Sequence, residues 1–291
     1  MKPLFQITNP DPKYLIIDFA NLVWRVTTVK TNTVFARKDG YPTSHLFLFA
    51  RSIIALLKQY PQHTPLFVLE GSTANRRKVF PEYKGQRLHD PEAFDPFPDL
   101  LPLLTFMTSA VAYNSDYEAD DVIYSIVTNF PGRHVVVSTD KDLWSLLSKA
   151  VVVNGSKGEL KLEQVQKAFG ECPLESIALY KAIYGDPSDN IPPIKGLRWA
   201  QVLPWLQHCA TPTDLQAGLN AAIASGLNIT EGKLLANIEL IHNRYLVTQL
   251  NLVNYQLITY PGLPNELRNW LEKYEITSLL PEVPRLARPE N

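Results

Sequence analysis

Short apolar runs alternate with amphipathic segments along the first half of the chain. Four runs have the length and composition of buried strands: YLIID at 14–18, PLFVLE at 65–70, HVVVSTDKD at 134–142 and AVVVN at 150–154. Segments with apolar residues at helical spacing predict helices at 42–60, 118–130 and 143–148. This alternation of strands and helices indicates a parallel α/β sheet.

The pattern changes after about residue 160, where strand-like runs stop and helices are predicted at 172–185 and 230–250. Residues 88–116 are rich in Pro, Asp and Phe, which indicates an irregular or partly helical excursion over the sheet edge. We therefore expect an α/β core at 1–165 and a helical region at 166–291.

Acidic residues stand at the end of three predicted strands: Asp18, Glu70, and Asp140 with Asp142. Because ligands of a parallel sheet bind beyond the carboxyl ends of its strands, these acids should gather at one edge. The stretches YEADDV at 117–122 and GDPSDN at 185–190 bring further acids to the set. The nine candidate metal ligands are Asp18, Glu70, Glu118, Asp120, Asp121, Asp140, Asp142, Asp186 and Asp189.

An oxygen-only ligand set suits Mg²⁺ or Mn²⁺ rather than zinc. Two such ions about 3.5–4 Å apart would support hydrolysis of a phosphodiester. Each acid taken alone is better explained as a helix cap, a turn residue or part of a solvated patch. The joint pattern favours the metal site, because independent caps have no reason to converge on one sheet edge.

The charge balance changes once these acids are set aside. The chain has 28 Lys and Arg against 29 Asp and Glu, so removal of nine acids leaves 28 − (29 − 9) = +8. Five basic residues also cluster within a short segment, namely Arg76, Arg77, Lys78, Lys84 and Arg87. A metal-filled pocket on a basic protein suits a polyanionic substrate.

Other features bound the setting of the protein. Its two cysteines have neither zinc-ligand nor disulfide-framework spacing, no run approaches about 20 apolar residues, and the N-terminus lacks an apolar signal core. We therefore expect a reduced, cytoplasmic protein with no role in a membrane.

The motifs IIDFAN, FPEYKGQR, YEADDV, STDKDLWSLL and GDPSDNIP occur in this order. Together they resemble the 5′→3′ exonuclease and flap endonuclease family, which includes the 5′-nuclease domain of bacterial DNA polymerase I and stand-alone bacteriophage enzymes. The resemblance covers roughly residues 14 to 260. It implies a PIN-like, mostly parallel central sheet flanked by helices, a helical arch at about 88–116, and a C-terminal helical region with a helix–hairpin–helix.

The resemblance also implies site roles. Asp18, Glu118, Asp120 and Asp121 match the acids of a first metal site, and Asp140, Asp142, Asp186 and Asp189 those of a second. Lys84 matches the family's active-site lysine and Arg87 its partner arginine. The implied substrate is DNA with a 5′ end or a flap junction, in replication, repair or primer removal, with an RNA–DNA hybrid as a further candidate. Arg76, Arg77 and Tyr83 are expected to contact this DNA, Tyr83 by stacking on a base.

The sequence departs from the family pattern at three places. Glu70 stands where the family usually has Asp. In NIPPIKGLRWAQ, at 190–201, Pro193 replaces the first glycine of the hairpin and only Gly196 remains, which argues against a K⁺ site. Duplex contact is then expected from Lys195, Gly196 and Arg198. Finally, no polymerase region follows, so we expect a free-standing, monomeric nuclease.

Two other functions stay open at this point. A catalytically silent DNA-junction-binding protein could share the same frame, although it would have no use for nine repelling carboxylates. A small-molecule phosphohydrolase with Asp18 as nucleophile would need a second acid two residues later, where the chain has Ala20.

Overall fold

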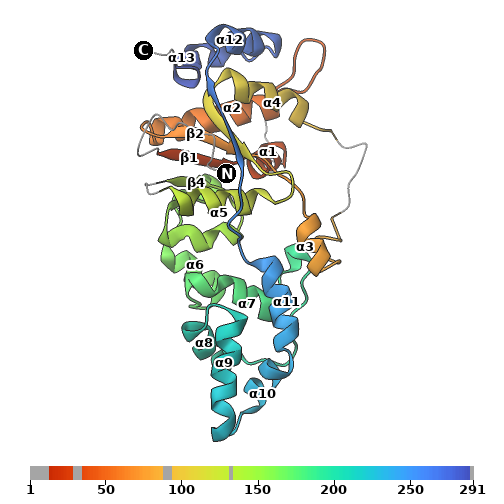
Figure 1. The fold of residues 1–291 in the computed structure, drawn as a ribbon. Coiled ribbons are helices and arrows are strands. Elements are labelled where there is room, and N and C mark those ends of the chain that lie inside the picture. Colours follow the sequence, from red (N-terminus) through yellow and green to blue (C-terminus); the bar gives the residue numbers. More distant parts are fainter. Residues whose placement is uncertain (1–12, 29–34, 88–93, 131–133, 289–291) are drawn as a thin grey trace.

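A six-stranded sheet forms the centre of the molecule in the computed structural model, which describes residues 13–28, 35–87, 94–130 and 134–288 (Figure 1). Its strands are β1 (Tyr14–Asp18), β2 (Thr64–Val68), β3 (Thr108–Tyr113), β4 (Val135–Val137), β5 (Val151–Val153) and β6 (Gln256–Pro261). Their order is β5-β4-β1-β2-β3-β6. The first five strands are parallel, and β6 runs antiparallel to β3.

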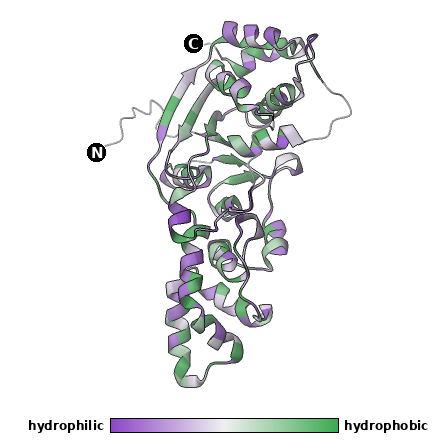
Figure 2. Ribbon diagram, turned by 90° about the vertical axis from the view of Figure 1, so that its right-hand side faces the viewer, coloured by the Kyte–Doolittle hydropathy of each residue, from purple (hydrophilic) through white to green (hydrophobic). Residues whose placement is uncertain are grey.

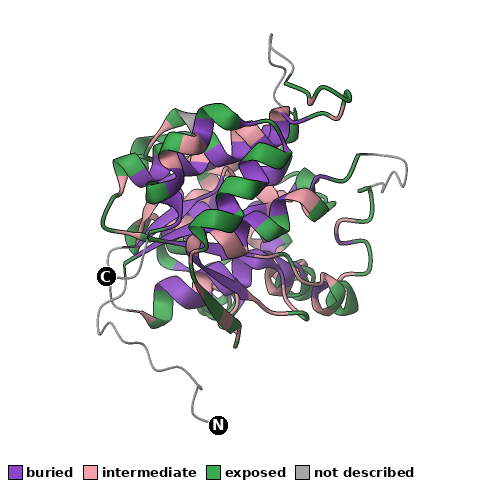
Figure 3. Ribbon diagram, turned by 90° about the horizontal axis from the view of Figure 1, so that it is seen from above, coloured by how far each residue is buried: buried purple, intermediate pink, exposed green. Residues whose placement is uncertain are grey.

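Every residue of β1 is buried, because helices cover both faces of the sheet. Tyr14 and Ile16 belong to one apolar cluster, whereas Leu15 and Ile17 belong to the other. This alternation follows from the two-residue period of a strand, which turns successive side chains to opposite faces. The inner strands are accordingly mostly apolar in Figure 2 and lie in the buried interior in Figure 3.

The helices form two layers and an extension. The first layer contains α1 (Phe19–Thr28), α2 (Ser44–Gln59), α4 (Phe97–Phe106), α12 (Pro264–Lys273), the 3₁₀ helix η6 (Thr277–Glu282) and α13 (Val283–Leu286). The second contains α5 (Ala119–Asn129), η1 (Asp142–Ser148), α6 (Leu162–Phe169), η3 (Leu174–Ser176) and α7 (Ile177–Tyr184). The extension contains α8 (Trp199–His208), α9 (Pro212–Ala222), η5 (Ile223–Ser225), α10 (Ile229–Ala236) and α11 (Ile238–Thr248). Three short helices lie in connections: α3 (Ala74–Val79), η2 (Gly155–Lys157) and η4 (Pro187–Asp189).

The core of the second layer continues without a break into the helical extension. One apolar cluster includes Ile16 of β1, Leu179 of α7, Leu206 of α8 and Ile241 of α11. In Figure 1, α8 to α10 form the end of the molecule that lies farthest from α12 and α13. The extension is therefore packed as a continuation of the α/β core.

Two strands differ from the sequence expectation. β3 and α4 lie inside the segment expected to be an arch at 88–116, and both belong to the packed core, so the excursion is shorter than expected. Part of it, residues 88–93, lies outside the described residues. β6 lies in the region expected to be helical, and its side chains are exposed or half-buried, which is why it shows no apolar run.

The expected helix at 230–250 is in fact two helices, α10 and α11, which meet at Asn237. Residues 143–148 form a helix as expected, but one of the 3₁₀ type that already begins at Asp142. The strand expected over 134–142 is therefore limited to Val135–Val137, and the backbone is already helical at Lys141.

Gly71 provides a test of how tightly the connection after β2 is packed. A Cβ atom at Gly71 would lie 2.0 Å from the backbone oxygen of Asn114 and 2.1 Å from that of Tyr117. We expect Gly71→Ala to lower the free energy of unfolding by about 1–3 kcal/mol, measured by urea denaturation, because backbone atoms must move. Gly232→Ala in α10 is the control, since no atom lies within 4 Å of its Cβ position. It should be neutral or stabilising by up to about 1 kcal/mol, and equal midpoints for both variants would contradict this packing.

Candidate metal centre

The end of β1 lies at the point where the order of the sheet reverses. β1 pairs with β2 on one side and with β4 on the other, so the strands that follow it extend in both directions. Open α/β sheets bind ligands in the crevice at this topological switch point. Asp18 is the last residue of β1, and Asp140 follows three residues after the end of β4.

Hydrogen bonds fix these two loops against each other. Asp18 accepts hydrogen bonds from the Ser138 hydroxyl at 2.9 Å and from the Asn21 backbone N–H at 3.1 Å. The Asn21 amide oxygen accepts the Thr139 backbone N–H at 3.1 Å, and its Nδ2 lies 3.0 Å from the Thr139 hydroxyl. The start of α1 and the loop that carries Asp140 are thus held as one unit.

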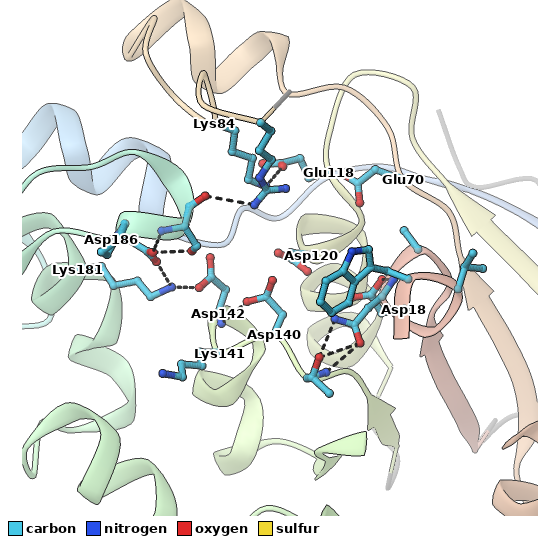
Figure 4. Close-up of a pocket in the computed structure, with 18 of the residues that line it drawn as sticks. Asp18, Glu70, Lys84, Glu118, Asp120, Asp140, Lys141, Asp142, Lys181 and Asp186 are labelled. Carbon is cyan, nitrogen blue, oxygen red and sulfur yellow. Dashed lines mark hydrogen bonds and ion pairs between the residues drawn. The ribbon is translucent and has the colours of Figure 1, made fainter. Parts of the chain in front are cut away.

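A cleft of about 1140 Å³ opens at this edge of the sheet (Figure 4). Seven of the nine candidate acids line it: Asp18, Glu70, Glu118, Asp120, Asp140, Asp142 and Asp186. They come from β1, the loops after β2 and β4, the start of η1, the start of α5 and the turn after α7, and the fold brings them together as the sequence predicts.

Two overlapping carboxylate groups have the spacing of metal ligands. One consists of Asp120, Asp140 and Asp142, and the other of Asp142, Asp186 and Asp189; within each group the ligand oxygens lie within 4.8 Å of one another. Asp142 belongs to both groups, so it stands where two adjacent cation positions would meet.

The acids on the side of the cleft near β1 have no ion-pair partner among the described residues, and the charge of Lys84 only partly offsets their burial. Asp18 and Asp120 are only 6% and 9% exposed, and within the described residues no salt bridge reaches either of them or Asp140. Burial raises the pKa of Asp18 to about 6 despite its two hydrogen bonds. Burial, together with the charges of Asp140 and Asp18, holds the pKa of Asp120 well above its usual value.

The side near α7 is compensated. Lys181 forms ion pairs with Asp142 and Asp186, while Asp189 lies 3.9 Å from the Lys84 Nζ and 3.5 Å from an Arg87 guanidinium nitrogen. The pKa of Asp186 is lowered because the Lys181 charge and hydrogen bonds outweigh burial.

The structure corrects the expectation for Arg76 and shows its ion pair with Asp121. Arg76 is 6% exposed and pairs with Glu118 and with Asp121, the latter at 2.9 Å. Asp121 also accepts the backbone N–H of Asn251 at 2.8 Å and lies outside the residues that line the cleft. Arg76 is therefore an internal counter-ion in this structure instead of a DNA contact, and Asp121 is one of its partners. The ligand role of Asp121 stays a prediction.

The stacking expected of Tyr83 is also wrong for this structure, because its side chain is fully buried. Its hydroxyl lies 2.9 Å from Glu118 and 3.1 Å from Arg76, and its ring packs in a small cluster with Ile191 and Val247. Tyr83 thereby orients Glu118, whose second oxygen contacts the Lys84 ammonium.

The other expected DNA contacts are on the surface. Arg77 is exposed and lines a second hollow that adjoins the cleft, together with Lys84 and Arg87. Lys195, Gly196 and Arg198 are exposed in the turn between α7 and α8. The Gly196 carbonyl accepts a hydrogen bond from Lys233 at 3.0 Å. The roles of these residues stay predictions.

Sequence reasoning did not single out Trp24 and Lys181 as residues of the cleft. Trp24 lies on α1, lines the cleft and is 67% exposed, and Lys181 points into the acids from α7. For Trp24, the available signal in the sequence was its position six residues after Asp18. Lys181 gave no signal, because a lysine in an amphipathic helix is ordinarily solvated.

The residues present fit a divalent cation of the hard, oxygen-binding class. The grouped ligand atoms are all carboxylate oxygens, and two groups of three lie within ligand spacing. Asp18 and Asp120 are buried beside further acids without a cationic partner in the described part of the chain, and a bound cation would remove this repulsion.

The raised pKa of Asp18 predicts how the stability of the metal-free protein depends on pH. The folded protein keeps this proton at a pH where the unfolded chain has released it, so the free energy of unfolding should fall as the pH rises from about 4 through about 6. Asp18 alone should contribute a loss of about 1 kcal/mol between about pH 5 and pH 7.5, measured by denaturation in EDTA. Saturating Mg²⁺ should reduce this loss.

Asp18→Asn is the matched control for this experiment, because its side chain cannot ionise. The variant should lose less stability over the same pH interval. An equal pH dependence in the variant and in the wild-type protein would show that Asp18 is not the titrating group.

Residues 13–170 match the model of the 5′-3′ exonuclease N-terminal, resolvase-like domain. The thermostable DNA polymerase I of Thermus filiformis is 29% identical over 97% of this chain, and the chain spans 34% of that relative. The 5′-3′ exonuclease of Aquifex aeolicus is also 29% identical, over 86% of this chain and 88% of its own length.

Solved structures support the fold. The bacteriophage T5 5′-exonuclease with bound divalent metal ions aligns with a TM-score of 0.62 at 20% identity, covering 95% of this chain and 100% of that one. The T5 flap endonuclease in a complex with DNA and metal ions gives 0.61 at 20% identity, over 93% and 98%. The expected mostly parallel α/β fold is thus confirmed. Since the family model matches more than half of the sequence, the chain belongs to the 5′-3′ exonuclease family.

Proposed function

We propose that this protein is a divalent-metal-dependent 5′ nuclease that hydrolyses DNA phosphodiesters at a 5′ end or a flap junction. The observation that carries the proposal is the cleft at the switch point, where seven carboxylates meet and those near β1 have no cationic partner in the described residues. The polymerase relatives carry this region as about a third of their length, and the Aquifex relative is named as an exonuclease.

We assign two adjacent cation positions, with Mg²⁺ or Mn²⁺ as occupants. Asp18, Asp120 and Asp140 would hold one ion and Asp186 and Asp189 the other, with Asp142 between them. When bound, such ions activate a water molecule and stabilise the leaving oxygen of a phosphodiester. Glu70 lies at the exposed rim, where it can bind through a water molecule.

Lys84 and Arg87 supply positive charge at the cleft. Lys84 has a φ of 53°, a backbone conformation that is uncommon for a residue with a side chain, and its N–H donates to the Asp189 carbonyl at 3.0 Å. This hydrogen bond and the Glu118 contact hold the ammonium over the acids. The Arg87 side chain is 56% exposed and can reach a phosphate that approaches from solvent.

The cleft continues into a second hollow of about 750 Å³. The two share a set of lining residues: Ala20, Glu70, Lys84, Arg87 and Glu118. A single strand that lies across this shared wall would place a phosphate beside the acids while its ends occupy the two hollows.

Trp24 supplies an aromatic surface for such a strand. Its indole is 67% exposed and lines the same cleft as the acids. Exposed aromatic rings beside a phosphate-binding groove bind unpaired bases by stacking, without sequence preference. Trp24 would thus set the position of the nucleotide next to the cleaved bond.

Substitutions at two neighbouring aspartates, Asp120 and Asp121, distinguish a catalytic role from a structural one. A 5′-labelled DNA flap and a blunt duplex are incubated with the protein in Mg²⁺, Mn²⁺ or EDTA, and the products are sized. Wild-type protein should cut near the junction in either metal and not in EDTA. Asp120→Asn should abolish cleavage without loss of fold, because it removes a buried carboxylate from the first group.

Asp121→Asn is the control, since this residue pairs with Arg76 outside the cleft. It should retain cleavage but unfold more readily, because Arg76 loses a buried partner. Full activity of a well-folded Asp120→Asn protein would overturn the metal assignment. Tight flap binding by the wild-type protein without cleavage in either metal would instead indicate a DNA-junction-binding protein.

Trp24→Ala should weaken binding of the single-stranded part of the substrate. Stacking of one base is worth about 1–3 kcal/mol, so we expect a loss of about fivefold or more in affinity for a flap, measured by fluorescence anisotropy in Ca²⁺. Trp24→Phe should recover part of this loss. Equal affinities of the alanine variant and the wild-type protein would exclude a stacking role.

A further inference from the structure

Lys181 lies inside the acidic cleft, where the proposed function gives it no role. It belongs to the last turn of α7, and its side chain is 6% exposed. Its Nζ atom contacts a carboxylate oxygen of Asp142 and lies 2.7 Å from one of Asp186 (Figure 4). A buried ammonium needs such partners, since burial without them is costly.

Lys181 makes the two halves of the cleft electrostatically unequal. Each carboxylate of the Asp142–Asp186–Asp189 group has a cationic partner, because Asp189 lies near Lys84 and Arg87. Asp18 and Asp120 have none in the described part of the chain. The half near β1 therefore attracts a divalent cation strongly, whereas the acids of the other half already lie beside Lys181, Lys84 and Arg87.

The Lys181 ammonium and a divalent cation would compete for the same oxygens. Mg²⁺ binds carboxylate oxygens at about 2.0–2.1 Å, so an ion in the Asp142–Asp186–Asp189 group would lie next to the Nζ atom. Two cations this close repel strongly in a site with little water. Occupation of this group therefore requires that Lys181 leave at least one of its two partners.

We propose that Lys181 is a built-in competitor of the divalent cation at the Asp142–Asp186–Asp189 group. Its ammonium neutralises Asp142 and Asp186 in the metal-free protein, and an ion enters this group only as Lys181 withdraws. The position near β1, formed by Asp18, Asp120 and Asp140, binds a divalent cation first, at lower metal concentration. This inference rests on the proposed function, because it takes these acids to be metal ligands.

A purely structural role for Lys181 predicts a different outcome. An ion pair that only ties α7 to η1 would stabilise the fold and leave metal affinity unaffected by its removal. Competition predicts that removal of the ammonium tightens metal binding, because the ion no longer has to displace it. Metal affinity in the absence of DNA therefore distinguishes the two roles.

The test is a calorimetric titration of the full chain with Mn²⁺, without DNA. We expect two binding events in the wild-type protein. In Lys181→Met the weaker event should tighten by about tenfold or more, while the tighter event changes by less than about threefold. If the affinity of the weaker binding event is unchanged or reduced in a folded Lys181→Met protein, the proposal is overturned.

Lys141→Met is the matched control. Lys141 lines the same cleft and is exposed, and its ammonium lies over the Trp144 ring at 5.9 Å without an ion pair among the described residues. Its replacement removes one positive charge from the cleft without freeing a carboxylate. If Lys141→Met tightened the weaker binding event as much as Lys181→Met does, the effect would come from the overall charge of the cleft. That result would overturn the specific role of Lys181.

A second measurement uses wild-type protein and does not depend on the folding of a variant. A crystal structure with Mn²⁺, located by its anomalous signal, should show an ion at Asp142, Asp186 and Asp189 with the Lys181 ammonium displaced from at least one partner. An ion at this group with both ion pairs intact would overturn the inference. If the wild-type protein cleaves the flap but keeps both Lys181 ion pairs with the ion bound, only the competition is refuted. If it neither binds Mn²⁺ nor cleaves the flap, the proposed function is refuted as well.

Discussion

Repulsion between carboxylates at one edge of the sheet is the constraint on which the rest of this structure depends. The strand order brings Asp18 next to Asp140, and α5 begins with Asp120 against them, so burial raises the cost of every negative charge. Positive side chains then divide the acids into two classes. Arg76 and Lys181 neutralise the acids that tie α3, α5, α7 and η1 together, and the acids nearest β1 remain without such a partner in the described residues.

The parts of the fold that could be predicted are those in which burial on both faces leaves a continuous apolar run. β1 and β4 show such runs, and the alternation with helices indicates the parallel sheet. β6 could not be found in this way, because an antiparallel edge strand has exposed and half-buried positions throughout. β3 was hidden by a Pro-rich neighbourhood, although its residues are mostly buried in the sheet. In both cases the tertiary position, which local sequence does not encode, decides the strand.

The gathering of the acids could be predicted because strand direction alone places strand ends at one edge. Which acid faces the cleft and which pairs with a buried arginine could not be predicted, since Asp120 and Asp121 are adjacent in sequence and differ only in where α5 points them. The same holds for Arg76 and Tyr83, which read as surface residues of a basic segment. Their burial follows from the packing of α3 against α11, a contact between segments far apart in the chain.

The return of the chain from the helical extension to the sheet has a mechanical consequence. The extension leaves the core through α7 and comes back through β6, which pairs with β3 along six residues. Because the extension is joined to the core at both ends, it cannot move about a single hinge without also disturbing the packing of α7 or the pairing of β6.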